Sequence, residues 1–113
     1  MIQLQNYING KMCPPAGGTY IDNVNPATGE VYAKIPNSSE ADVNNAVLAA
    51  QAAFDKWSNM AAKKRSDILL RIAALIEQNL QRLAEAESLD NGKPVWLAKQ
   101  IDIPRAASNF HFY

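Results

Sequence analysis

The sequence predicts a chain that begins with short strands and turns, over residues 1–37, and continues as helices over residues 38–113. Four of the six prolines and four of the five glycines lie in the first region, whereas the second is rich in Ala, Leu, Ile, Lys and Glu. Val31, Ala33 and Ile35 alternate with other residues at the period of two that is typical of a half-buried strand, whereas apolar residues in the second region recur at helical spacing. The 113 residues suffice for one domain with a modest core.

The first region carries turn signals between its predicted strands. Asn9-Gly10 supplies the positive φ angles of a tight hairpin. Residues 19–24 are β-branched and aromatic and predict a second strand, and residues 25–29 (Asn-Pro-Ala-Thr-Gly) predict the turn after it. The third strand, over 31–35, is expected to end at Pro36.

The second region predicts three helices. Ser39 can cap the first, with Asp42 as a weak capping-box partner. The second is expected to run from 61 to 89. Apolar stripes define these two helices: Val43, Ala46, Val47, Ala50, Phe54 and Trp57 in the first, and Ile68, Leu69, Ile72, Leu75, Ile76, Leu80 and Leu83 in the second.

The third helix has a start signal but no stop signal. Asn91-Gly92 predicts a left-handed end for the helix before it, and Pro94 suits the first turn of the next. Pro104 lies inside this third helix, where it is expected to produce a kink. Because the last three residues are aromatic, we expect the chain to be cut from a longer one at residue 113.

Composition excludes several classes of function. With 11 basic and 11 acidic residues the formal net charge is zero, so nucleic acid is not an expected partner. No apolar run is long enough for a membrane span, and residues 1–9 lack the features of a signal peptide. The lone Cys13 cannot form an internal disulfide, which favours a reducing compartment, the cytoplasm.

Several catalytic motifs are missing. The five glycines form neither a G-x-G-x-x-G pattern nor a phosphate loop, and no cysteine pair or H-E-x-x-H motif occurs. Cys13 has no nearby base in the sequence, so we interpret it as a small apolar residue rather than a nucleophile. His111 is interpreted in the same way, as an aromatic residue on a helix face.

Three strings stand out in combination. They are N-P-A-T-G-E at 25–30, L-D-N-G-K-P at 89–94 and D-I-P-R-A at 102–106. With the hairpin at 7–11 and the helix pattern A-A-x-x-A-F-x-x-W, the chain resembles the amino-terminal part of the NAD(P)-dependent aldehyde dehydrogenases, from about Leu4 to Tyr113.

The resemblance implies an α/β parent with a Rossmann-type cofactor domain, which these helices would flank. It also implies a homo-oligomeric oxidoreductase that oxidises an aldehyde to a carboxylic acid with NAD or NADP through a thioester-forming cysteine. The family's nucleophilic cysteine, its general-base glutamate and its nucleotide-contacting residues fall after the position that matches Tyr113. The segment therefore holds no catalytic and no cofactor-binding residue, and alone it is expected to be inactive.

The resemblance also implies a monovalent cation site. In family members such a cation lies between backbone oxygens just before the N-P-x-T-G-E string and the aspartate of the D-N-G-K-P string. The matching positions are Asn23, Val24 and Asp90. Asp90 follows helical carbonyls with partial negative charge, which suits a cation. The alternative is that its carboxylate accepts backbone N–H groups in the turn.

Arg105 is the sharper candidate. The string I-D-I-P-R-A-A-x-N-F is similar to that of the hydroxymuconic and aminomuconic semialdehyde dehydrogenases, in which the matching arginine grips the distal carboxylate of the substrate. A guanidinium binds a carboxylate in a bidentate manner, so the chemistry fits. In those enzymes the arginine faces the substrate tunnel, and Ile101, one turn earlier, would line the wall of that tunnel. The alternative is that Arg105 is a surface arginine on a helix.

The sequence also allows an interpretation as a different class of protein. The chain could be a small helical interaction module without enzymatic activity. A reading frame that continues past Tyr113 into a long α/β sequence would favour the enzyme, and a stop codon there would favour the module.

Overall fold

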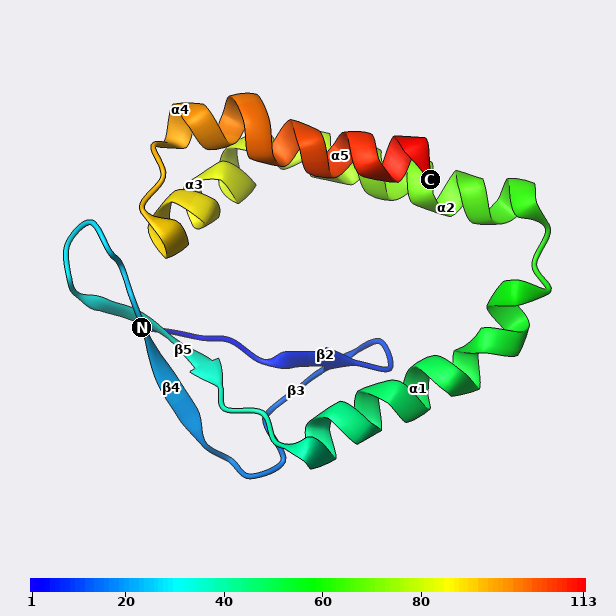
Figure 1. Cartoon of the computed structure of the whole chain (residues 1–113), viewed down its shortest axis with the longest axis horizontal. Coiled ribbons are helices and arrows are strands. Elements are labelled where there is room, and N and C mark those ends of the chain that lie inside the picture. Colours follow the sequence, from blue (N-terminus) through cyan, green and yellow to red (C-terminus); the bar gives the residue numbers. More distant parts are fainter. The chain divides into compact units, whose positions relative to one another are not determined.

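The computed structural model describes every residue from Met1 to Tyr113. The chain forms two compact units. The first unit consists of Met1–Val24 and Gly29–Asn59, and the second of Asn25–Thr28 and Met60–Tyr113. Strands occur only in the first unit, and Figure 1 shows the elements in sequence colours.

A three-stranded sheet forms the base of the first unit. The strands predicted over 19–24 and 31–35 are present as β4 (Tyr20–Val24) and β5 (Val31–Pro36), which pair antiparallel, and β5 ends at Pro36. β1 (Ile2–Gln3), which the sequence analysis did not predict, pairs parallel with β5, so that the strand order is β1-β5-β4. Ala33 of the central strand is fully buried, as expected of a residue on the inward face.

A separate hairpin confirms the Asn-Gly prediction. β2 (Asn6–Ile8) pairs antiparallel with β3 (Lys11–Cys13). Asn9 has a φ of 52° and Gly10 a φ of 74°, so both central residues of the turn lie in the left-handed region that a two-residue hairpin requires.

α1 (Glu40–Ser58) begins at the predicted cap. The Asp42 carboxylate accepts hydrogen bonds from the Ser39 backbone N–H at 2.8 Å and the Ser39 hydroxyl at 3.1 Å. It also accepts one from the backbone N–H of Ala16, at 2.8 Å, in the loop between β3 and β4. These bonds, first that from the Ser39 backbone and then that from Ala16, hold the pKa of Asp42 below its usual value, although desolvation opposes them. One carboxylate thus starts the helix and ties a distant loop to it.

The second predicted helix is divided in two, so the prediction of one helix over 61–89 is wrong. α2 (Ala62–Gln78) ends and α3 (Leu80–Asn91) begins at Asn79. The Asn79 side-chain amide donates a hydrogen bond to the Leu75 carbonyl at 2.8 Å, and the same carbonyl accepts the Asn79 backbone N–H at 3.1 Å. No Gly or Pro lies at the break, and the apolar stripe continues across it, so the sequence pattern predicted a single helix.

The last helical stretch contains a wide turn. α4 (Val95–Leu97) leads into the π-helical turn η1 (Ala98–Asp102) and then into α5 (Ile103–Phe112). The Ile103 N–H bonds the Ala98 carbonyl, five residues back. Pro104 therefore lies in the first turn of α5, directly after a wide turn, rather than deep within a regular α-helix. The predicted kink at Pro104 stays a prediction.

Alanines form the core of the second unit. The buried side chains are Ala73 of α2, Ala84 of α3, Ala98 of η1 and Ala107 of α5, and each is at most 1% exposed. α5 packs along α2, and η1 packs against α3. Small residues at these positions let the helix backbones approach closely. Large apolar side chains lie outside this core: no large side chain is fully buried in the chain.

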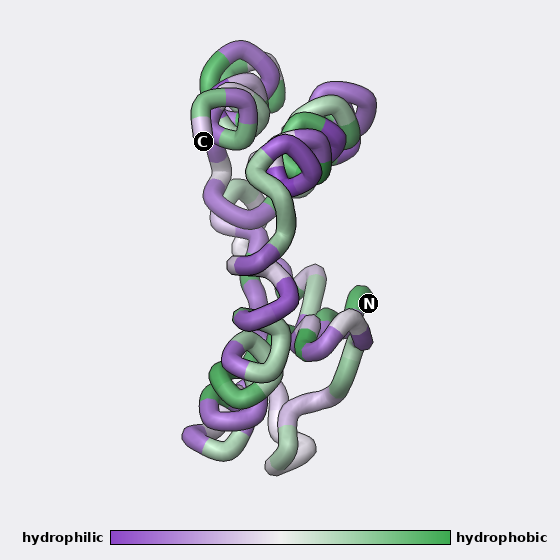
Figure 2. The backbone as a smooth tube through the Cα atoms, turned by 90° about the vertical axis from the view of Figure 1, so that its right-hand side faces the viewer, coloured by the Kyte–Doolittle hydropathy of each residue, from purple (hydrophilic) through white to green (hydrophobic).

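The apolar stripe of α1 is exposed as well. Val43, Val47 and Phe54 are 58%, 48% and 63% exposed. Figure 2 shows hydrophobic and hydrophilic residues alternating along the helices, as the predicted amphipathic pattern requires. None of the helices is long and apolar enough to cross a membrane.

Candidate functional site

Two of the three conspicuous strings meet in the second unit. Gly92 ends α3 with a φ of 79°, and its N–H donates to the Ser88 carbonyl at 2.9 Å. A Cβ placed on Gly92 would lie 3.0 Å from Cγ of Pro26, in the turn formed by Asn25–Thr28. The N-P-A-T-G turn therefore packs directly on the end of α3, and glycine at position 92 satisfies both the left-handed cap and the close approach.

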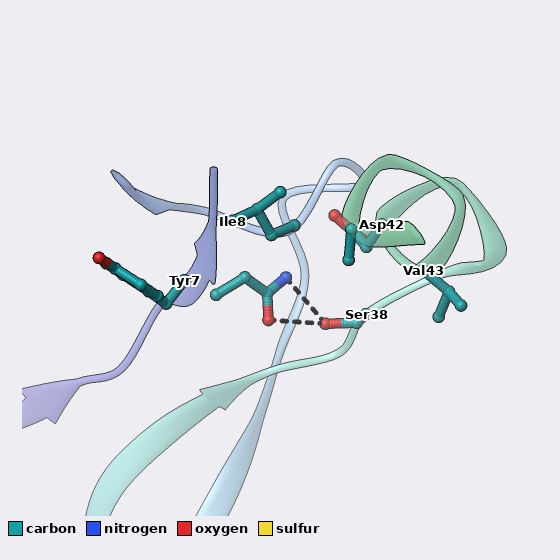
Figure 3. Close-up of a pocket in the computed structure, with 7 residues that line it drawn as sticks. Tyr7, Ile8, Ser38, Asp42 and Val43 are labelled. Carbon is teal, nitrogen blue, oxygen red and sulfur yellow. Dashed lines mark hydrogen bonds between the residues drawn. The ribbon is translucent and has the colours of Figure 1, made fainter. Parts of the chain in front are cut away.

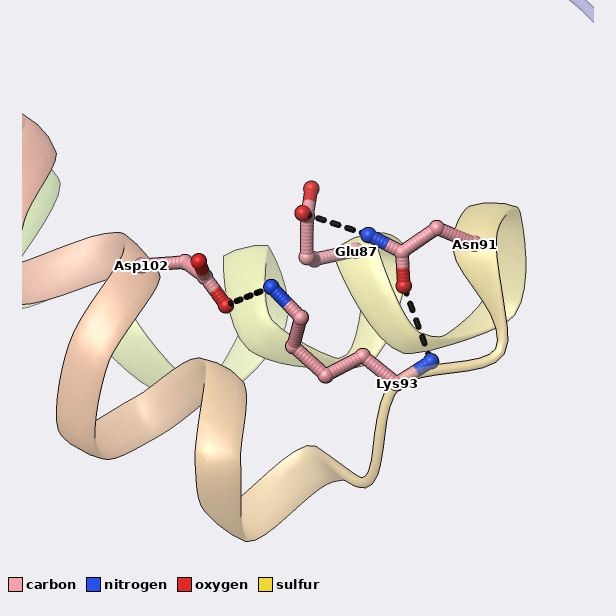
Figure 4. A network of polar contacts seen from close by, with 4 residues as sticks. All are labelled: Glu87, Asn91, Lys93 and Asp102. Atoms are coloured by element: carbon pink, nitrogen blue, oxygen red, sulfur yellow. Dashed lines mark hydrogen bonds and ion pairs between the residues drawn. The ribbon is translucent and has the colours of Figure 1, made fainter.

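A chain of polar contacts continues from this helix end (Figure 4). The side-chain amide of Asn91 donates to Oε1 of Glu87 at 2.6 Å, and its Oδ1 accepts the backbone N–H of Lys93 at 2.8 Å. The Lys93 Nζ then donates to Oδ2 of Asp102 at 2.7 Å. Both side chains of this ion pair are about one-third exposed, at 31% and 28%. The contacts join the end of α3 to the last residue of η1.

Arg105 lies in the first turn of α5, three residues after Asp102 of this ion pair. Its residue is exposed, and its guanidinium makes no hydrogen bond or ion pair, whereas its backbone carbonyl accepts the Ser108 hydroxyl at 2.9 Å. Ile101, in η1, is 51% exposed. The arginine head is thus available for an external carboxylate. A solvated helix arginine would have the same environment.

The residues predicted to hold a cation are distributed over both units. Asn23 and Val24 end β4 in the first unit, where the pairing with β5 is irregular, and the Asn23 amide donates to the Tyr32 hydroxyl at 2.9 Å. Asp90 lies in the last turn of α3 in the second unit. Carbonyl and carboxylate oxygens are suitable ligands for a hard cation. No group of three or more His, Cys, Asp and Glu side chains forms a metal cluster.

Cys13 and His111 lie apart from these strings. Cys13 is a half-buried free thiol at the end of β3, with its Sγ 3.6 Å from the Asn6 carbonyl oxygen. His111 contacts a carboxylate that the sequence analysis did not assign to it: its Nε2 is 3.6 Å from Oε1 of Glu77 on α2, beside a pocket of about 160 Å³. Spacing along the chain gives no signal for a contact between two helices.

A second pocket, of about 200 Å³, lies between the hairpin and α1 in the first unit (Figure 3). Tyr7, Ile8 and Val43 contribute apolar walls, and Ser38 exchanges hydrogen bonds with Asn6 at 3.0 and 3.1 Å. Because Asp42 is already engaged by three donors, the pocket offers no free charged group for chemistry.

Sequence comparison decides the family. Residues 13–113 match the aldehyde dehydrogenase family. The chain belongs to the aldehyde dehydrogenase family. This confirms the resemblance drawn from the three strings, and residues 1–113 form part of an α/β fold of aldehyde dehydrogenase type.

Individual aldehyde dehydrogenases align over nearly the whole chain. The 2-aminomuconic semialdehyde dehydrogenase of Bos taurus is 47% identical over 113 residues, and the 5-carboxymethyl-2-hydroxymuconate semialdehyde dehydrogenase of Escherichia coli is 42% identical over 113 residues. The acetaldehyde dehydrogenase 2 of Cupriavidus necator is 44% identical over 111 residues, which is 98% of this chain and 22% of that protein. Among solved structures, PnpE in complex with nicotinamide adenine dinucleotide superposes with a TM-score of 0.94 at 38% identity, over 98% of this chain and 23% of that one.

The chain spans about a quarter of the length of these aldehyde dehydrogenases. The two muconic semialdehyde dehydrogenases match 100% of the chain with 23% and 24% of their own lengths. That the family's nucleophile and nucleotide site lie outside these residues stays a prediction. In this chain the one strand-to-helix connection, over 37–39 between β5 and α1, contains no glycine, so it offers no phosphate-binding turn for a dinucleotide.

Proposed function

We propose that the chain is the amino-terminal part of an NAD(P)-dependent aldehyde dehydrogenase that oxidises an aldehyde bearing a distal carboxylate. The overall reaction consumes an aldehyde, water and NAD(P)⁺ and yields a carboxylate, NAD(P)H and two protons. The nicotinamide takes up the hydride when it is bound. The family membership of residues 13–113 supports the reaction class. No residue of this chain is assigned to the cofactor.

The contribution of this chain is substrate selection through Arg105. Its guanidinium is exposed and unpaired, and it lies in α5 three residues after the end of the π-helical turn. It can therefore bind a substrate carboxylate without breaking an existing contact. A planar guanidinium and a carboxylate form two parallel charge-assisted hydrogen bonds, which fix the orientation of the substrate as well as its charge. Ile101 would supply an apolar wall beside it. The names of the two muconic semialdehyde relatives support this substrate class.

The test is a comparison of two substrates in the full-length protein. Adipic semialdehyde and hexanal differ only in the distal carboxylate. Arg105→Ala should lower kcat/KM for adipic semialdehyde by roughly 10- to 150-fold, because a charge-assisted contact contributes ~1.5–3 kcal/mol. Oxidation of hexanal should be unchanged. Arg105→Lys should restore part of the loss, because an ammonium keeps the charge but not the bidentate geometry.

Two outcomes contradict the proposal. Equal losses on both substrates would assign Arg105 a structural role. An unchanged kcat/KM on both would make it a solvated helix residue and would favour a neutral aldehyde as the substrate.

The proposal extends to a monovalent cation and to an oligomer. The cation would be held by the backbone oxygens of Asn23 and Val24 and by the carboxylate of Asp90. Carbonyl and carboxylate oxygens are the ligand types that suit a hard cation, and this chemistry supports the proposal. The full-length protein is proposed to be a homo-oligomer in the cytoplasm, without nucleic acid or membrane partners.

A further inference from the structure

The ion pair between Lys93 and Asp102 spans the segment that leads to Arg105. Lys93 lies before α4, and Asp102 is the last residue of η1, so the pair brackets α4 and the whole π-helical turn. Lys93 is also held at its backbone, because its N–H donates to Asn91 (Figure 4). One end of the pair is therefore anchored to the end of α3, and the other end fixes the residue from which α5 departs.

The π-helical turn decides which face of α5 carries Arg105. In a regular helix each residue advances the rotation by about 100°, so one additional residue in a turn rotates everything after it by about that angle. Pro104 favours this wide turn, because in a regular α-helix its ring would clash with the carbonyl of Gln100, four residues earlier. A contact that holds η1 in its wide form therefore fixes the direction of the Arg105 side chain.

We propose that Lys93 and Asp102 form a positioning pair that aims the Arg105 guanidinium at the distal carboxylate of the substrate. This inference depends on the proposed function of Arg105. The pair does not touch the substrate. Its partial burial, at 31% and 28% side-chain exposure, makes it less screened than the chain's other ion pairs, in which every side chain is at least 43% exposed.

The experiment measures kcat and KM of the full-length protein with adipic semialdehyde and with hexanal. Lys93→Met removes the ammonium and keeps most of the side-chain length. We expect the KM for adipic semialdehyde to rise by about 5- to 10-fold, a smaller loss than that of Arg105→Ala because the guanidinium is misdirected rather than absent. The values for hexanal and the kcat for both substrates should be unchanged. Lys93→Arg should keep the parent KM, because it restores a cation opposite Asp102.

The matched control is Lys99→Met. Lys99 lies in η1 itself, is half-buried and makes no ion pair, so this variant removes the same charge from the same segment without breaking the pair. Its KM for both substrates should equal that of the parent. If Lys93→Met does not fold, as judged by its thermal melt, Asp102→Leu provides the same test, because it removes the acceptor of the Lys93 ammonium.

The double variant Lys93→Met/Arg105→Ala distinguishes the possible failures. If the pair acts through Arg105, its loss should cost nothing further once Arg105 is alanine. If Arg105→Ala discriminates between the substrates but Lys93→Met does not, or if the two losses multiply, the positioning inference is overturned and the proposed function stands. If Arg105→Ala does not discriminate, the proposed function falls, and the positioning inference falls with it.

Discussion

Replacing Gly92 by alanine should destabilise the junction between the turn at 25–28 and the end of α3. Gly92 has a φ of 79°, a conformation that costs an L residue ~1–2 kcal/mol. The added Cβ would also lie 3.0 Å from Cγ of Pro26, closer than ordinary van der Waals contact. Because two hydrogen bonds to Asn25 close the turn that contains Pro26, we expect this overpacking to cost a further ~1–2 kcal/mol. The total loss in the free energy of unfolding should be ~2–4 kcal/mol.

A double-variant cycle separates the two contributions. The assay is urea denaturation of the full-length protein with Gly92→Ala, Pro26→Ala and the combination. Pro26→Ala removes Cγ but keeps the Cβ, which would lie at 3.7 Å and makes an ordinary contact. In that background Gly92→Ala should cost only the ~1–2 kcal/mol of the backbone conformation. Equal costs in both backgrounds would refute the packing of the turn on α3, and no cost in either would refute the left-handed cap.

Two further predictions concern the first unit and the isolated chain. Asp42 has a folded pKa below its unfolded value of 3.8, so its stabilising contribution should be complete above pH 3.8 and lost as the pH falls through the folded pKa. In urea denaturation, the difference in the free energy of unfolding between the parent and Asp42→Asn should therefore shrink at low pH. A difference that stays constant with pH would contradict the hydrogen bonds assigned to Asp42. The isolated 113-residue chain should self-associate and bind a hydrophobic dye, since Val43, Val47 and Phe54 on α1 are exposed. Phe54→Ser should weaken both the self-association and the dye binding. A chain that is monomeric in light scattering and binds no dye would show that these side chains are covered.

Local signals in the sequence predicted the turns and caps well. Asn9-Gly10 and Gly92 adopt left-handed backbone conformations that few residue types favour. The Ser39–Asp42 capping box depends on hydrogen bonds between residues close in sequence. These features can therefore be predicted without knowledge of tertiary contacts. The same holds for β5, whose alternation ends at Pro36.

Features that depend on distant residues could not be predicted. β1 has two residues and gains its hydrogen bonds only from β5, about thirty positions later. Asn79 divides a helix through a side-chain hydrogen bond that competes with the backbone, although the apolar stripe continues across it. The contacts of Lys93 with Asp102 and of Glu77 with His111 join separate helical segments, and no spacing rule within one regular helix points to them.

The candidate site could be predicted from the sequence only in part. The three strings predicted the family, whereas the role of Arg105 stays a prediction because the exposed side chain suits both a substrate-binding and a solvated arginine. Arg65 is a residue that the sequence analysis missed. Its Nε is buried without a hydrogen-bond partner, and the sequence shows only an arginine in the first turn of a helix.

The most direct test of the account is a crystal structure of the full-length protein with adipate, the product of adipic semialdehyde oxidation, bound in the substrate tunnel. The measurement is the distance from the Arg105 guanidinium nitrogens to the distal carboxylate oxygens. We expect two contacts of about 2.7–2.9 Å, as in a bidentate charge-assisted pair. An Arg105 side chain directed into solvent, with the distal carboxylate held by other groups, would contradict the assignment of this residue to substrate selection.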